Sequence, residues 1–182
     1  LKKKNINSNF VEGLRVTDRE TVKIVEEVLS NDINKKIVND INISGGQAES
    51  FAGNRNNLIE AEKLKMEVKD SDSNIEKILD LGFVGNPIKI DISIINKSID
   101  KGNIPVIAPL GIDKKGDTYN INADTAAGAI AGALKADKLL LLTDVAGILD
   151  ENKKLISSLS LEEALQIINK EYILGGMKPK IS

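Results

Sequence analysis

The chain has 182 residues, of which 41% are hydrophobic and 29% are charged, as expected of one globular domain with a sizeable core. Its net charge of −2, its five aromatic residues (three Phe, two Tyr) and the lack of an apolar run of about 20 residues predict neither a nucleic-acid nor a membrane partner. With no Cys and no His, any chemistry must use Asp, Glu, Lys, Arg, Asn and backbone groups.

The first third of the chain predicts a strand or hairpin and then two helices. The strand or hairpin is expected to follow the tail of a helix and to end over residues 11–16. Thr17 and Glu20 form a capping-box pattern, so Thr17 is expected to cap the first helix. Apolar residues at helical spacing over 33–41 predict the second helix, which ends before Gly45-Gly46.

The middle of the chain predicts a sheet covered by helices. The charge-rich segment 60–80 predicts an exposed ribbon and turn, and a helical stretch follows over 91–101. Continuous apolar runs at 104–110 and 138–144 predict two buried strands, separated by a helix that Asn122 opens. This order is typical of parallel strands, so we predict an α/β fold with a mainly parallel sheet sandwiched by helices.

One strand-to-helix junction concentrates polar groups: Asn120, Asn122 and Asp124 lie within five positions. Asn122 is a good N-cap, and the positive end of the helix dipole there favours a nearby anion. Ligands of parallel sheets gather at the carboxyl ends of strands, where Thr143 and Asp144 are also expected. The junction therefore predicts a site for a polar ligand.

The end of the chain predicts one more helix, from a capping box at Ser160 and Glu163 to about residue 169. No internal repeat, low-complexity tract or interdomain linker interrupts the sequence. We therefore expect residues 1–182 to form a single domain.

Six segments, in their order and spacing, resemble the N-acetylglutamate kinases of the amino acid kinase family. They are Gly-Leu-Arg-Val-Thr-Asp at 13–18, Leu-Gly-Phe-Val-Gly at 81–85, Ile-Pro-Val-Ile-Ala-Pro at 104–109, Asn-Ile-Asn-Ala-Asp at 120–124, Leu-Thr-Asp-Val-Ala-Gly-Ile-Leu-Asp at 142–150 and Gly-Gly-Met-Lys-Pro-Lys at 175–180. The resemblance implies phosphorylation of the side-chain carboxylate of N-acetyl-L-glutamate by ATP, in arginine biosynthesis. It also implies a partial amino acid kinase domain of the carbamate kinase type. Residues 1–110 would form the acetylglutamate-binding and dimer lobe, and 111–182 the ATP-binding lobe.

By this resemblance, Arg15 binds a carboxylate of the acetylglutamate, a role that suits the planar guanidinium better than a lysine. Asn120 and Asn122 bind the amide and carboxylate of the substrate. Asp124 orients catalytic lysines, and Lys180 stabilises charge on the transferring phosphoryl group. Phosphoryl transfer needs positioning and positive charge more than proton abstraction, so a chain without histidine suits this chemistry.

The resemblance also implies an ATP site and an assembly. The expected nucleotide-binding residues are Thr143, Asp144, Val145, Gly147, Ile148, Leu149, Gly175, Gly176 and Met177. Mg²⁺ is implied through ATP, held by phosphate oxygens and water, so no protein metal ligand is expected. The protein is expected to be cytoplasmic and to form a homodimer, or a hexamer where an extra N-terminal helix is present.

The sequence departs from the family in two respects. The family's first strand with its catalytic lysine, two glycine loops and the segment beyond Lys180 are not in this sequence. Both ends are therefore expected to be cuts, and this chain by itself is expected to be inactive or nearly so. In addition, a Ser-Gly-Lys-Asp-like stretch reads Ala52-Gly53-Asn54-Arg55 here, which loses a lysine near the active site.

Two other functions stay open at this point. A sister kinase for acetylaminoadipate is one, because one methylene in a pocket discriminates by only about 1 to 3 kcal/mol. The other is a noncatalytic acetylglutamate or nucleotide sensor, which would bind the acid without ATP turnover and which the altered Asn54-Arg55 pair favours. A fold used only for assembly is disfavoured because the site residues are present as a set.

Overall fold

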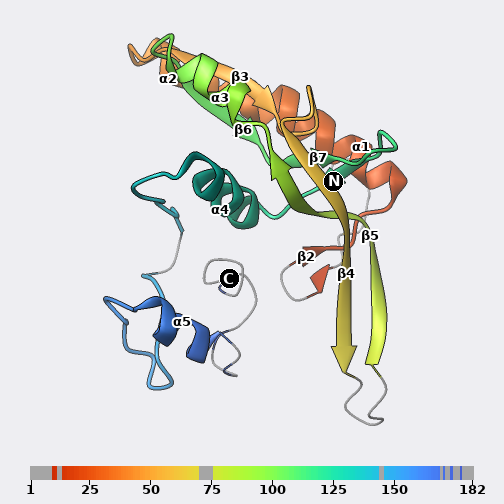
Figure 1. Ribbon diagram of the computed structural model, residues 1–182, viewed down its shortest axis with the longest axis vertical. Helices are drawn as coiled ribbons and strands as arrows, with labels where there is room; N and C mark the ends of the chain where they lie inside the picture. The colour runs from red at the N-terminus through yellow and green to blue at the C-terminus, as the bar shows by residue number, and fades with distance from the viewer. Residues whose placement is uncertain are drawn as a thin grey trace.

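The computed structural model describes residues 10–11, 14–69, 76–143, 146–168, 170, 173 and 177. These residues form helices and strands in an α/β arrangement (Figure 1). The helices are α1 (Arg19–Glu27), the π-helical η2 (Val28–Ile33), α2 (Asn34–Ile43), α3 (Ile92–Ile99), α4 (Ala123–Leu134) and α5 (Leu161–Ile167). The strands are β1 (Phe10–Val11), β2 (Leu14–Arg15), β3 (Ala48–Ala52), β4 (Ile59–Lys69), β5 (Glu76–Ile90), β6 (Ile104–Ala108), β7 (Leu110–Ile112) and β8 (Thr118–Asn120). None of the helices in this described part is long and apolar enough to cross a membrane.

The strands form mixed sheets. β1 and β2 pair antiparallel, β3 and β6 pair parallel, and β4, β5, β8 and β7 close into a small barrel in that order. Within the barrel, β4 and β5 form a long antiparallel arm that projects from the body (Figure 1). Helices α2 and α3 both pack against β6. The predicted α/β class is confirmed, the described sheets are mixed, and the strand at 104–108 runs parallel to β3. The described residues of the arm match the ribbon expected over 60–80.

Several predicted helix boundaries are confirmed because their signals are local. Asp91 caps α3, and Asn122 caps α4. Ser160 and Glu163 form both hydrogen bonds of a capping box at the start of α5. Helix α2 ends at Ile43, before the glycines at 45 and 46, as expected.

The prediction that Thr17 caps α1 is wrong. The cap is Asp18, whose carboxylate accepts the N–H of Thr21 at 2.7 Å. Thr17 is fully buried and bridges to β5, where its N–H donates to the Leu81 carbonyl at 2.9 Å and its carbonyl accepts the Phe83 N–H at 2.6 Å. Tertiary pairing at Thr17 therefore overrides the local capping signal.

Helices α1 and α2 are joined without a break by η2. The buried Asn34, at the start of α2, donates its amide N–H groups to the carbonyls of Phe51 at 3.1 Å and Val106 at 2.8 Å. These two carbonyls belong to β3 and β6, so Asn34 fixes the helix to both strands of the parallel pair. The wider π-helical turn that precedes it is a feature often found at functional sites.

The buried strand predicted over 138–144 is wrong over the described residues 138–143, and Asp144 lies outside the described part. Leu140 is 81% exposed and Leu142 is 95% exposed. A buried strand requires a neighbour for its backbone hydrogen bonds. None of the strands that the structure describes pairs with this run, so its apolar composition alone does not make it a strand.

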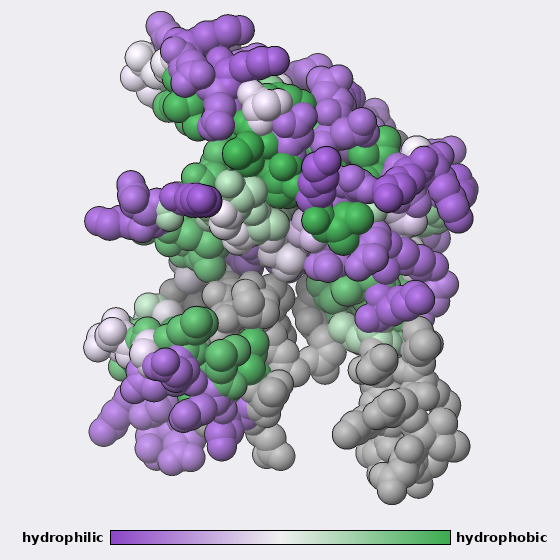
Figure 2. All heavy atoms as spheres, viewed as in Figure 1, coloured by the Kyte–Doolittle hydropathy of each residue, from purple (hydrophilic) through white to green (hydrophobic). Residues whose placement is uncertain are grey.

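Two apolar clusters form the core. The larger one consists of Leu58, Ile59, Ala61, Ile95, Ile121 and Ala126 and joins the barrel to α3 and α4. The smaller one consists of Ala52, Ala108 and Leu110 and lies against Val25 and Leu29 of the α1–η2 segment. On the visible face, further hydrophobic residues are exposed around α5 (Figure 2). Leu161 and Leu165 of this helix are both exposed.

Gly82 is required where β5 meets Thr17. It has a φ of +75°, and a Cβ built on it would lie 2.1 Å from the Thr17 carbonyl oxygen. We expect Gly82→Ala to lower the free energy of unfolding by about 2 kcal/mol or more, measured by urea denaturation. Gly102→Ala is the control, because Gly102 has a similar φ of +79° but open space around its Cβ position. Equal losses in the two variants would contradict the proposed clash.

Candidate active site

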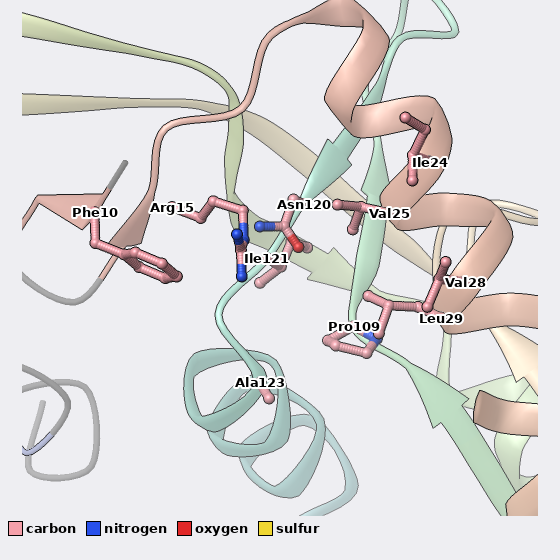
Figure 3. A pocket seen from close by; sticks show the side chains of 10 residues that line it. All are labelled: Phe10, Arg15, Ile24, Val25, Val28, Leu29, Pro109, Asn120, Ile121 and Ala123. Atoms are coloured by element: carbon pink, nitrogen blue, oxygen red, sulfur yellow. The ribbon is translucent and has the colours of Figure 1, made fainter. Parts of the chain in front are cut away.

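A pocket of about 660 Å³ lies between the α1–η2 helix, the end of β8 and the start of α4 (Figure 3). Its lining residues are Phe10, Arg15, Ile24, Val25, Val28, Leu29, Pro109, Asn120, Ile121 and Ala123. Only two of these side chains are polar, and Figure 3 shows the Arg15 guanidinium beside the Asn120 amide. An apolar cavity with a few convergent polar groups is typical of a small-molecule site.

Arg15 is held in place by a cation–π contact of its side chain and by a hydrogen bond to its backbone carbonyl. Its guanidinium carbon lies 4.4 Å from the centre of the Phe10 ring, within cation–π range. The Thr17 hydroxyl donates to the Arg15 carbonyl at 2.8 Å. Because Thr17 is itself paired with β5, the strand that carries Arg15 is fixed to the barrel.

Asn120 is held by strands on both sides of β8. It pairs with Leu110 of β7 and with Val84 of β5, and the next residue, Ile121, donates its N–H to the Pro109 carbonyl at 3.1 Å. A position fixed by the barrel suits a binding residue, since a side chain on a rigid strand is placed more precisely than one on a loop.

The β7–β8 turn is stabilised by Asp113. Its carboxylate accepts the N–H groups of Lys115 at 2.8 Å and Asp117 at 3.0 Å, and the Tyr119 hydroxyl at 3.2 Å. Burial opposes ionisation of Asp113, but the hydrogen bonds from Asp117, Lys115 and Tyr119 outweigh it, so the pKa of Asp113 lies below its ordinary value. Burial, followed by the negative charge of Asp113, raises the pKa of Tyr119. The network holds the strand that ends at Asn120.

The apolar wall opposite Arg15 comes from α1 and η2. Ile24 and Val25 lie on α1, while Val28 and Leu29 begin η2. The helical spacing of Ile24, Val25 and Val28 predicts an apolar helix face. Leu29, which follows Val28 in the π-helical turn, lies outside this spacing, and no sequence signal singles out Phe10. These two lining residues were not predicted from the sequence.

The cap of this wall-forming helix makes stability depend on pH. The Thr21 N–H, followed by the Thr21 hydroxyl, lowers the pKa of Asp18 in the folded protein. A lowered pKa means that charged Asp18 stabilises the fold above its unfolded pKa of about 3.9, and that this contribution is lost as the pH falls through the lower folded value. From pH 6 to pH 3 we expect the thermal midpoint of the wild type to fall more than that of Asp18→Asn, a non-titrating cap. Parallel pH curves would contradict this expectation.

Asn122 and Asp124 lie beside the pocket but do not line it. The side-chain amide oxygen Oδ1 of Asn122 accepts the N–H groups of Asp124 at 2.9 Å and Thr125 at 3.1 Å, so this side chain caps α4. Asp124 is half-buried in the first turn of that helix. Its carboxylate therefore lies at the positive end of the helix dipole.

The expected nucleotide-binding and phosphoryl-binding residues are only partly described. Asp144, Val145, Gly175, Gly176 and Lys180 lie outside the described residues. Of the others, Leu149 forms an isolated antiparallel bridge with Leu155, and the Ile148 carbonyl accepts the N–H of Ile156 at 2.8 Å. Gly147 lies in the same turn with a φ of +141°.

Thr143 and Met177 complete the described part of this set. In the described part of the chain, no three Asp or Glu side chains gather in a group able to hold a metal ion.

Comparison with known proteins identifies the family of this chain. The amino acid kinase family matches residues 1–182. The chain belongs to the amino acid kinase family. It is 55% identical to the acetylglutamate kinase of Rhodospirillum centenum and 52% identical to that of Afipia carboxidovorans. These alignments cover 100% and 97% of this chain but only 59% and 60% of the relatives, so the chain spans about three fifths of their length.

Solved structures share the fold. The crystal structure of smu.665 from Streptococcus mutans UA159 superposes with a TM-score of 0.82 at 30% identity, over 99% of this chain and 68% of that one. An N-acetylglutamate synthase from Neisseria gonorrhoeae, solved with coenzyme A and N-acetyl-glutamate, has a TM-score of 0.74 at 23% identity and covers 99% of this chain and 38% of that one. The second likeness concerns the fold alone.

Proposed function

We propose that the protein to which this chain belongs is an acetylglutamate kinase, which phosphorylates the side-chain carboxylate of N-acetyl-L-glutamate with ATP in arginine biosynthesis. The observation that carries the proposal is the convergence of Arg15 and Asn120 in one otherwise apolar pocket. The 55% and 52% identity to curated acetylglutamate kinases supports the same activity.

The pocket chemistry suits an acylated amino acid. The Arg15 guanidinium binds a carboxylate through two parallel N–H donors. The Asn120 amide both donates and accepts, so it suits the acetamido group without adding charge. The apolar wall formed by Val25, Val28 and Leu29 packs against the aliphatic carbons of the substrate. In this arrangement Asn122 binds the substrate through its amide N–H groups, since its oxygen caps α4.

The catalytic part of the proposal concerns Asp124 and Lys180. Lys180 stabilises the negative charge of the transferring phosphoryl group, and Asp124 orients that ammonium. The nine residues named above from Thr143 to Met177 bind ATP. Mg²⁺ would be held by the nucleotide phosphates and water and would supply positive charge beside the phosphates. Residues 1–110 then supply the acid-binding lobe and 111–182 the nucleotide-binding lobe.

We further propose a cytoplasmic homodimer, with a hexamer as the larger alternative. The support on this chain is a pair of exposed isoleucines one helical turn apart on η2 and α2, Ile33 at 45% and Ile37 at 43% exposure. Contiguous exposed apolar residues of this kind mark a protein–protein contact. Light scattering of the complete gene product, with Ile37→Glu as the variant, tests this assignment.

The activity is tested by trapping the acyl phosphate with hydroxylamine, using the complete gene product, ATP, Mg²⁺ and N-acetyl-L-glutamate. We expect ATP-dependent hydroxamate formation. Faster turnover of acetylaminoadipate in competition would assign the sister activity. Calorimetric binding of acetylglutamate without ATP turnover would assign a sensor.

A further inference from the structure

We infer that Asn54 is a positioning residue that couples the two walls of the acid-binding pocket through its amide N–H groups. Asn54 follows β3, in the stretch Ala52-Gly53-Asn54-Arg55. Its side-chain nitrogen lies 2.9 Å from the Glu26 carboxylate and 3.0 Å from the Thr118 hydroxyl oxygen. The inference rests on the proposed function, because the experiment that tests it uses acetylglutamate as the ligand.

The two partners of Asn54 belong to opposite walls of the pocket. Glu26 lies on α1, directly after Val25, which lines the apolar wall. Thr118 begins β8 and lies two residues before Asn120, so both side chains lie on the same face of the strand. The Asn54 amide therefore links α1, which forms part of the apolar wall, to β8, which carries Asn120.

The environment of Asn54 makes this link rigid. The residue is 7% exposed. Its amide oxygen is buried without a hydrogen-bond partner among the described residues, so the two N–H donations alone orient the side chain. Donation to a carboxylate is a charge-assisted hydrogen bond, stronger than one between neutral groups.

The turn that carries Asn54 is also fixed. The preceding Gly53 donates its N–H to the Ala108 carbonyl at 3.1 Å, and its carbonyl accepts the Ile59 N–H at 2.7 Å. A Cβ at Gly53 would lie 2.0 Å from the Leu110 carbonyl oxygen, so the backbone here lies close against β7. The backbone that carries Asn54 is therefore fixed to the sheet, and the two hydrogen bonds of the Asn54 side chain hold α1 and β8 at fixed positions relative to it.

The test compares kinetic constants of the complete gene product and its variants. Asn54→Leu keeps the side-chain size and removes both donors, and Asn54→Asp puts an acceptor opposite Glu26. For both we expect the KM for acetylglutamate to rise about tenfold, with kcat and the KM for ATP changed far less. Asn54→Lys supplies N–H donors for both acceptors again and is expected to restore most of the KM.

Controls separate positioning from folding. Arg55→Ala changes the exposed neighbouring side chain and should leave the KM unchanged. If Asn54→Leu does not fold, Thr118→Val removes one of the two bonds and should raise the KM by a smaller factor. The inference would be overturned if Asn54→Leu lowered the apparent kcat and left the KM for acetylglutamate unchanged. It would also be overturned if Asn54→Leu raised this KM and Asn54→Lys did not restore it. A wild type that binds no acetylglutamate would instead overturn the proposed function.

Discussion

Substitution of Arg15 by lysine is expected to raise the KM for acetylglutamate about 10- to 100-fold in the complete gene product, although the charge is kept. The reason is geometric. Only a guanidinium offers two parallel donors to a carboxylate, and the cation–π contact with Phe10, at 4.4 Å, holds that plane in the pocket. Lysine is a point charge on a flexible stem, so it loses both the bidentate contact and the orientation.

The matched control for this experiment is Arg19→Lys. Arg19 also lies over a ring, 4.8 Å from the centre of Phe83, and pairs with Asp117 at 3.5 Å, but it does not line the pocket. Its side chain is 67% exposed, so the substitution should leave the KM near the wild-type value. Similar KM changes in the two variants would contradict a specific role for Arg15.

Substitution of Asp124 by asparagine is expected to lower kcat by about 10²-fold or more, while the KM for acetylglutamate changes little. The side-chain size is kept, and α4 keeps its Asn122 cap, because that cap uses the backbone N–H groups of residues 124 and 125. What is lost is the carboxylate that we propose to orient the lysine ammonium during phosphoryl transfer. Steady-state kinetics with saturating ATP measure the effect.

Asp137→Asn is the control for this second experiment, since Asp137 is an exposed aspartate just beyond α4. It should have wild-type kcat and KM. If Asp124→Asn raised the KM and left kcat intact, Asp124 would be a binding residue and the proposed catalytic role would be wrong.

The sequence predicted elements whose determinants are local. The Asn122 cap of α4 and the Ser160–Glu163 capping box of α5 require only a few neighbouring residues, and both are present. Predictions failed where a distant partner decides the outcome. Thr17 bridges to Gly82 instead of capping, and residues 138–143 have no strand beside them among those described.

The candidate site also contains some residues that the sequence predicted and others that depend on distant packing. Arg15 and Asn120 were named from the resemblance, and the structure brings them to one pocket. Their roles in binding stay predictions. Phe10 and Leu29 were missed because a cation–π contact and a π-helical turn depend on packing that the sequence pattern does not predict. Asn54 stood out as a departure from the family, but its burial between Glu26 and Thr118 is visible only in the fold.

The most direct test of this account is a crystal structure of the complete gene product with bound N-acetyl-L-glutamate. We expect a carboxylate of the ligand within hydrogen-bond distance of the Arg15 guanidinium and a second polar group of the ligand at the Asn120 amide. The molecule has another, polar pocket of about 890 Å³, lined in part by Lys89, Asp91 and Lys114. Ligand bound there, with Arg15 and Asn120 untouched, would contradict the assignment of the acid-binding site.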